Sequence, residues 1–249
     1  MKKRLQYRKG IYLLPSLFTT GNVFCGFYAF IAVFNDDFGI AGWAIVFAII
    51  FDVLDGRVAR LTNTTSEFGE QYDSLADIIS FGMAPAFLAY AWVLKPYGRL
   101  GWMVAFLFLL CGTLRLARFN STQPDVKSQH FVGLPIPGAA AVIASIVIAF
   151  EDVFTTRLSP IIMVIVVFLL AFLMVSNIKY PAFKKLEFKK RVASLRFLLV
   201  IVSLSVMAMF PELALCVISF GFVLWGPISY LKKGKMVPAD GPKETTQPD

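Results

Sequence analysis

The segment that decides the fold is FDVLDGRVARLTNTTSEFGEQYDSLADIISFGMAPA, residues 51–86, which joins two long apolar runs. Acidic residues are scarce in the chain, yet this segment holds the aspartates Asp52, Asp55, Asp73 and Asp77. Because residues three or four positions apart lie on one face of a helix, each pair points in one direction from its helix. If the two helices pack as a hairpin around residues 61–68, the four carboxylates face one another across a gap lined by glycine.

A cluster of this kind needs a cation. Each carboxylate costs roughly 2.5–3.5 kcal/mol at the centre of a bilayer, so four unpaired carboxylates would cost on the order of 10 kcal/mol. Oxygen ligands suit Mg²⁺, Mn²⁺ or Ca²⁺ better than zinc, which prefers nitrogen and sulfur. Two such ions are a common arrangement for displacement at phosphorus. The segment therefore predicts a divalent metal site that acts on phosphate.

Small and basic residues accompany the acids. Gly56, Ala59 and Gly69 leave room for a substrate to approach the backbone, and the guanidinium of Arg60 can bind phosphate with two hydrogen bonds. Together with the aspartates they form the string D-x2-D-G-x2-A-R-x8-G-x3-D-x3-D. This string resembles the signature of the CDP-alcohol phosphatidyltransferase family at every fixed position.

The resemblance implies a role for each residue of the string. Asp52, Asp55 and Asp73 would be metal ligands, and Asp77 would be both a metal neighbour and the general base. The CDP portion of the substrate would bind at Gly56, Ala59, Arg60 and Gly69. The resemblance also implies a divalent cofactor, Mg²⁺ or Mn²⁺ and two ions in number, and a homodimer.

Three further stretches indicate which branch of the family the chain resembles: DSLADIISFGMAPA at 73–86, RLARFN at 115–120 and GLPIPGAA at 133–140. With them, the region from Pro15 to Ala140 resembles the phosphatidylserine synthase branch of the family. This resemblance implies transfer of the phosphatidyl group of CDP-diacylglycerol to the hydroxyl of L-serine, with release of CMP.

Composition predicts the fold class. The chain is 57% hydrophobic and 16% charged, with a mean hydropathy of +0.70, which indicates an all-α polytopic bundle in a membrane. The expected spans are eight: roughly 13–34, 38–58, 72–94, 101–118, 134–150, 160–177, 195–210 and 213–230. They divide the chain into a basic N-terminus (1–12), a transmembrane domain (13–231) and a disordered tail (232–249).

Basic residues predict the orientation. With the N-terminus in the cytoplasm, the external connections carry only Lys95, Arg99 and Arg157, and every other Lys and Arg falls on the inner side. This bias puts both termini and the aspartates at the cytoplasmic face of the cell membrane. It also accounts for the net charge of +8 without nucleic acid as a partner. Residues 179–196, rich in bases, predict an interfacial helix held by anionic membrane lipid.

Other polar residues have two interpretations each. Asn22 either bonds a neighbouring helix or lines the nucleotide pocket, and the resemblance favours the pocket. Arg115 and Arg118 share a face at the inner end of the fourth span. They either reach to lipid headgroups or bind the carboxylate of serine, with Arg118 preferred for the carboxylate. The cysteines Cys25, Cys111 and Cys216 lie in apolar runs and are interpreted as packing residues.

Two rival functions fit parts of the pattern. A sister enzyme of the family would use glycerol 3-phosphate or inositol phosphate, but a phosphate acceptor favours a denser basic cluster near the aspartates. A divalent-cation transporter would place its carboxylates near the middle of the bilayer, whereas these lie near the ends of their spans. Both rivals are therefore less favoured than transfer to serine.

Overall fold

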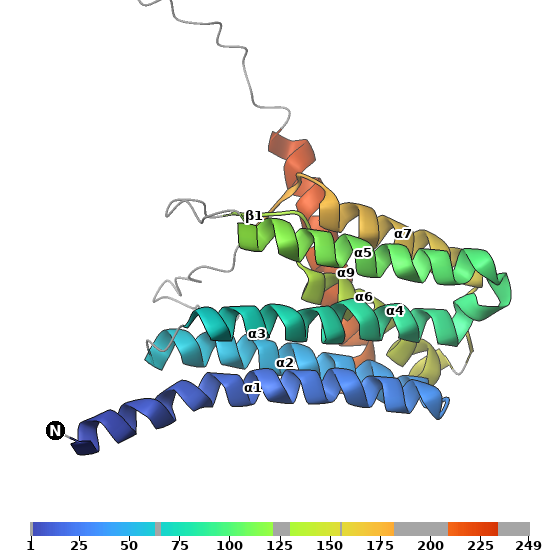
Figure 1. The fold of residues 1–249 in the computed structure, drawn as a ribbon. Helices are drawn as coiled ribbons and strands as arrows, with labels where there is room; N and C mark the ends of the chain where they lie inside the picture. Colours follow the sequence, from blue (N-terminus) through green and yellow to red (C-terminus); the bar gives the residue numbers. More distant parts are fainter. Residues whose placement is uncertain (1, 63–65, 122–129, 155, 182–208, 234–249) are drawn as a thin grey trace, which may run out of the picture.

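The computed structural model describes residues 2–62, 66–121, 130–154, 156–181 and 209–233, which form a bundle of helices with one short pair of strands (Figure 1). The α-helices are α1 (Lys2–Phe34), α2 (Phe38–Thr62), α3 (Glu67–Asp77), α4 (Ala84–Ala89), α5 (Arg99–Ser121), α6 (Ile136–Ile148), α7 (Pro160–Val175) and α9 (Pro211–Lys233). Shorter helical segments are η1 (Ile78–Met83), η2 (Tyr90–Leu94), η3 (Lys95–Tyr97) and η4 (Ala149–Phe154), and the strands are β1 (His130–Val132) and β2 (Lys179–Pro181).

The described residues confirm the predicted helical membrane bundle. Six helices are long and apolar enough to cross a membrane: 16–34, 38–62, 67–97, 99–121, 136–154 and 211–229. The expected span at 160–177 is a shorter apolar helix, Pro160–Val175, and the one expected at 195–210 lies outside the described residues. The basic N-terminus continues into the first span as one helix from Lys2. Helix α9 extends to Lys233, and the rest of the predicted tail lies outside the described residues.

One expected helix is wrong at its start. Residues 179–181 of the predicted interfacial segment form strand β2, which pairs antiparallel with β1, and residues 182–196 lie outside the described part. Tyr180 explains the extended backbone, because its ring is fully buried and its hydroxyl donates to Val223 O of α9 at 3.3 Å. Burial raises the pKa of Tyr180 to about 12, so the donor stays protonated at neutral pH.

A single long helix carries α3, η1, α4 and η2 from Glu67 to Tyr97. Its η1 segment is a π-helix, and Pro85 lies just beyond it in the first turn of α4. Proline has no N–H and clashes with the carbonyl four residues earlier, which here is that of Phe81. The wider π-helical turn accommodates that clash without ending the helix. Asp77 is the last α-helical residue before this turn.

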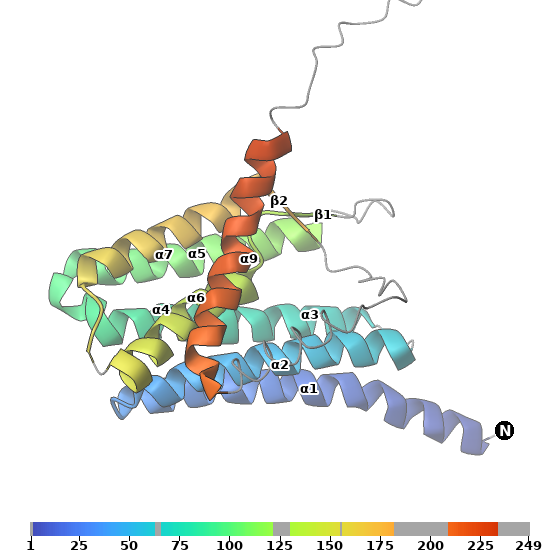
Figure 2. The same ribbon diagram turned by 180° about the vertical axis from the view of Figure 1, so that it is seen from behind.

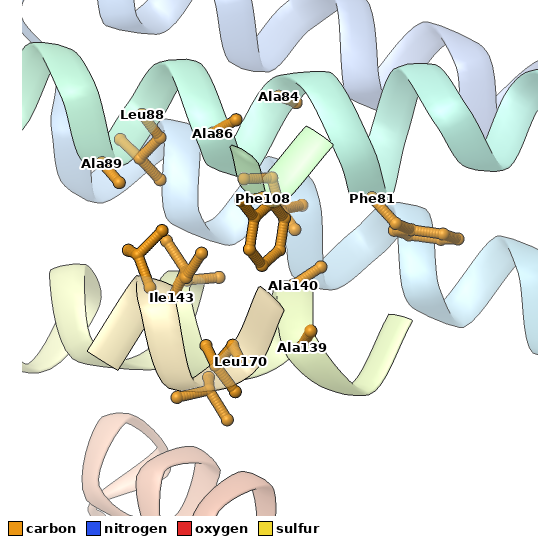
Figure 3. Packing of buried hydrophobic residues seen from close by; sticks show 14 of the residues in the cluster. Phe81, Ala84, Ala86, Leu88, Ala89, Phe108, Ala139, Ala140, Ile143 and Leu170 are labelled. Carbon is orange, nitrogen blue, oxygen red and sulfur yellow. The ribbon is translucent and has the colours of Figure 1, made fainter. Parts of the chain in front are cut away.

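Small residues let the helices approach closely. Helices α1, α2 and the α3–α4 helix run side by side, and α9 crosses the bundle steeply in both views (Figures 1 and 2). Figure 3 shows Phe108 of α5 between the α4 backbone and Ala140 of α6, with Leu170 of α7 beyond. The three cysteines are free thiols, and Cys25 and Cys111 pack against this core as predicted.

The two ends of the bundle differ in their polar residues. The aspartates lie at the end where α2 stops and α3 starts. At the opposite end, buried Trp92 donates its indole N–H to Glu151 Oε1 at 2.5 Å, and Arg157 donates to the carbonyl of Trp92 at 3.1 Å. The guanidinium of Arg157 also lies 5.0 Å from the ring centroid of Phe38. These contacts join α2, η2 and η4 far from the aspartates.

Substitution of Gly26 tests how closely α1 packs against the helix that carries Ser80. A Cβ added there would come within 2.9 Å of Ser80 Cα, and backbone cannot yield as a flexible side chain would. We expect Gly26→Ala to lower the free energy of unfolding by about 1–3 kcal/mol, measured as the midpoint of a denaturant titration in detergent micelles. Gly221→Ala is the control, because nothing lies within 4 Å of its Cβ position. Equal shifts for both variants would contradict the close approach.

Candidate metal centre

Three of the four predicted aspartates converge. Asp52 and Asp55 on α2 and Asp73 on α3 each offer one carboxylate oxygen, and these oxygens all lie within 4.8 Å of one another. Asp55 is buried, and the other two are half-buried. The expected hairpin is present, because α2 contacts the helix that continues from α3, at η1 and α4. Near the connection itself, α2 and α3 both pack against α1. The carboxylates therefore meet between two helices that a third helix holds.

Asp77 lies one turn deeper along the same helix. It is not part of the group of three, but its charge interacts with the charges of all of them and with that of Arg115. Among the described residues, Oδ1 of Asp77 and Oδ1 of Asp73 are buried without a hydrogen-bond partner. Buried carboxylate oxygens need a donor or a cation. The donor set of carboxylate oxygens therefore fits a hard divalent cation.

A threonine that the sequence analysis did not select orients the cluster. Thr19 of α1 is buried, and its hydroxyl donates to Asp55 Oδ2 at 3.1 Å. Partners of this kind fix the orientation of metal-binding carboxylates. The signal in the sequence was its spacing, because Thr19 lies three residues before Asn22 and hence on the same helix face.

Asn22 is fully buried, and neither atom of its side-chain amide has a partner among the described residues. Its backbone carbonyl accepts a hydrogen bond from Ser80 Oγ at 3.0 Å, which places it against the α3–η1 helix. Simple bonding to a neighbouring helix would have paired that amide. The observation thus favours the interpretation in which the amide binds a ligand.

The predicted CDP contacts lie on both helices, between the aspartates and the connection of α2 to α3. Gly56 and Ala59 are half-buried on α2, and Arg60 is exposed at its end. The position of a Cβ at Gly56 is 3.9 Å from Arg60 Nη2, so guanidinium and glycine are neighbours. Gly69 lies in the first turn of α3, where its N–H donates to the N-cap Ser66 Oγ at 3.1 Å.

The two arginines of α5 differ in their surroundings. Arg115 is only 8% exposed, and its Nε has no partner among the described residues. Arg118 donates to the carbonyls of Val175 (3.3 Å) and Ser176 (3.5 Å) and to Asn177 Oδ1 (3.4 Å). The charge of Arg115 interacts with that of Asp77, whereas Arg118 binds the end of α7.

Comparison with known proteins agrees with the signature. The sequence profile of CDP-alcohol phosphatidyltransferases matches residues 12–175, which include every site residue described above. The chain belongs to the CDP-alcohol phosphatidyltransferase family. This confirms the resemblance inferred from the string of aspartates, glycines and arginine.

Three relatives in this family carry the name CDP-diacylglycerol–serine O-phosphatidyltransferase. The relative from Helicobacter pylori strain 26695 is 40% identical over 226 residues, which are 89% of this chain and 92% of the relative. That from Bacillus subtilis strain 168 is 35% identical and covers 69% of this chain and 92% of its own length. That from Methanocaldococcus jannaschii is 43% identical over 56% of this chain and 62% of its own length.

Thr19 supplies a test of the metal centre. Thr19→Val removes the donor to Asp55, and we expect the affinity for Mn²⁺ to fall about 10- to 100-fold in a calorimetric titration. Thr19→Ser keeps the hydroxyl and should stay near the wild-type affinity. Thr113→Val is the matched control, because among the described residues the Thr113 hydroxyl bonds the carbonyl of Leu110 in its own helix, at 2.8 Å, and no other group. Wild-type Mn²⁺ affinity in Thr19→Val would show that this hydrogen bond does not support metal binding.

Proposed function

We propose that this chain transfers the phosphatidyl group of CDP-diacylglycerol to the hydroxyl of L-serine and releases CMP. The observation that carries the proposal is the convergence of Asp52, Asp55 and Asp73. It occurs in a chain that matches, over most of its length, relatives named CDP-diacylglycerol–serine O-phosphatidyltransferase. Acidic oxygens that can hold divalent metal suit a reaction at a diphosphate. The names of these relatives favour serine over glycerol 3-phosphate or inositol phosphate as the acceptor. Membership of a transferase family argues against a cation transporter.

The proposed roles follow the positions of the side chains. Asp52, Asp55 and Asp73, with Asp77 beside them, would hold Mg²⁺ or Mn²⁺, two ions in number. When bound, the metal neutralises charge on the diphosphate and stabilises the departing CMP. The nucleotide would lie against Gly56, Ala59 and Gly69, with Arg60 on its phosphates and the amide of Asn22 beneath it.

Asp77 is the proposed general base. It is buried one helical turn beyond Asp73, and its charge interacts with that of Arg115. Its carboxylate would accept the proton of the serine hydroxyl as that oxygen attacks the phosphorus of the phosphatidyl group. The bond from this phosphorus to the bridging oxygen then breaks, and CMP leaves with the bonding electrons. A serine hydroxyl is a weak nucleophile at neutral pH, so it needs a base to activate it.

Arg115 is the proposed partner of the serine carboxylate. Its burial, its unpartnered Nε and its place beside Asp77 suit a bidentate bond to a small anionic acceptor. This choice revises the preference for Arg118 that the sequence suggested, because Arg118 is hydrogen-bonded to the end of α7.

The proposal includes a membrane setting. The site would face the cytoplasm at the inner membrane, because the bases predicted to be external, Lys95, Arg99 and Arg157, lie at the end of the bundle opposite to the aspartates. There the acyl chains can remain in the bilayer while the diphosphate reaches the aspartates. A homodimer in membrane lipid is the assembly that the family resemblance implies.

The reaction can be tested by release of CMP from CDP-diacylglycerol by the purified protein in detergent. L-serine, glycerol 3-phosphate and inositol phosphate would be compared as acceptors, each with Mn²⁺, Mg²⁺ or a chelator. We expect release that requires both serine and metal. Release with another acceptor alone would refute the choice of serine, and no release with any acceptor would refute the transferase proposal.

Asp77→Asn tests the base. The amide cannot accept the proton, so turnover should fall by about 10²- to 10⁴-fold, while Mn²⁺-dependent binding of CDP persists in a calorimetric titration. Asp73→Asn is the comparison, because it removes a ligand of the group of three and should weaken CDP binding itself. If Asp77→Asn also lost CDP binding, its assignment as the base would be wrong.

A further inference from the structure

The last turn of α5 is held on two sides. Asn120 Nδ2 donates to Ser74 Oγ of α3 at 2.9 Å, and Ser74 follows the metal-site residue Asp73 directly. On the other side, Arg118 donates to the carbonyls at the end of α7 and to Asn177. Arg115 lies one turn before these contacts, on the same helix. The turn that follows Arg115 is therefore attached both to the helix of Asp73 and Asp77 and to α7.

The end of α7 offers acceptors and space for the guanidinium of Arg118. The last carbonyls of a helix have no partners within it, and a cation at a helix C-terminus also interacts favourably with the helix dipole. Gly133 adjoins the same place with a φ of 81°, a conformation that favours glycine. A Cβ at Gly133 would meet the carbonyl of Met174 and lie 3.1 Å from Arg118 Nη2. The missing side chain leaves room for the guanidinium.

We infer that Arg118 and Asn120 are positioning residues, which hold Arg115 beside Asp77 and thereby set the affinity of the site for the carboxylate of its acceptor. This inference rests on the proposed function, in which Arg115 binds that carboxylate. The final turn of a helix lacks part of its backbone hydrogen bonding and frays readily. Attachment of the turn to α3 and α7 fixes the backbone from which Arg115 projects, and a prearranged partner loses less entropy when the acceptor binds.

The test is a comparison of KM values for the two substrates. In Arg118→Gln we expect the KM for serine to rise by about 10- to 100-fold, because a small displacement of a positioned group has effects of that size. The KM for CDP-diacylglycerol and the Mn²⁺-dependent binding of CDP should stay within about twofold, since none of their proposed contacts involves α5. A general loss of structure would change all three quantities together.

Two further variants, Asn120→Ala and Asn177→Ala, each remove one attachment of the last turn of α5. Asn120→Ala removes the bond to Ser74, and Asn177→Ala removes one acceptor of Arg118, so each should raise the KM for serine selectively, by less than Arg118→Gln. Arg118→Lys keeps a charged donor at the end of α7 and should recover most of the affinity. Ser121→Ala is the matched control, because within the described part of the chain its hydroxyl bonds the carbonyl of Arg118 in its own helix and no other group, so its loss should change nothing.

Three outcomes would overturn the inference. A wild-type KM for serine in Arg118→Gln would show that the attachment has no effect on the acceptor. A rise in Arg118→Gln alone, with Asn120→Ala and Asn177→Ala unchanged, would mean that Arg118 contacts the carboxylate itself. Equal rises for serine and CDP-diacylglycerol would mean that the turn supports the whole site. Failure of the wild-type protein to release CMP with serine would instead refute the proposed function.

Discussion

Repulsion between carboxylates is the interaction on which the rest of the structure depends. At 4.8 Å, the outer limit for the three ligand oxygens, two unit charges repel by about 3–4 kcal/mol at an effective dielectric constant of about 20. Asp77 adds a fourth charge at a buried position. Helices with such faces would separate unless other contacts held them, and the site needs a cation before it can be electrically balanced.

Helix α1 supplies those contacts. It packs against α2 and against the helix that carries Asp73 and Asp77, and it donates a hydrogen bond to Asp55 through Thr19. Gly26 lets it approach Ser80 closely, which fixes the backbone of α1 against the helix of Asp73 and Asp77. The proposed substrate-binding region therefore consists of polar groups on helices whose buried apolar residues, such as Ala29 of α1 and Ala41 of α2, lie toward their other ends.

The sequence predicted what depends on spacing. Helical periodicity predicted that Asp52 and Asp55 share one face of their helix, and the apolar runs located the helices. The structure brings Asp73 to that pair, whereas Asp77 is not part of the group. Periodicity could not rank Arg115 against Arg118, because two residues three positions apart share a face and only the neighbouring α7 decides which is buried. Strand β2 also escaped prediction, since its extended backbone depends on burial of Tyr180 against α9, a contact distant in the sequence. Pro85 was visible, but whether it ends a helix or widens one turn depends on packing.

The parts of the site differ in how far apart they lie along the chain. Thr19, Asn22 and all four aspartates come from residues 19–77, whereas Arg115 and the α7 carbonyls that bind Arg118 come from 115–176. During synthesis the first three spans leave the ribosome together, so the metal-binding groups can assemble while α5 and α7 are still being made. Contacts close in sequence also form with a smaller loss of chain entropy. The order of synthesis thus gives the nascent chain the proposed cation site first and the proposed acceptor-binding residue only later.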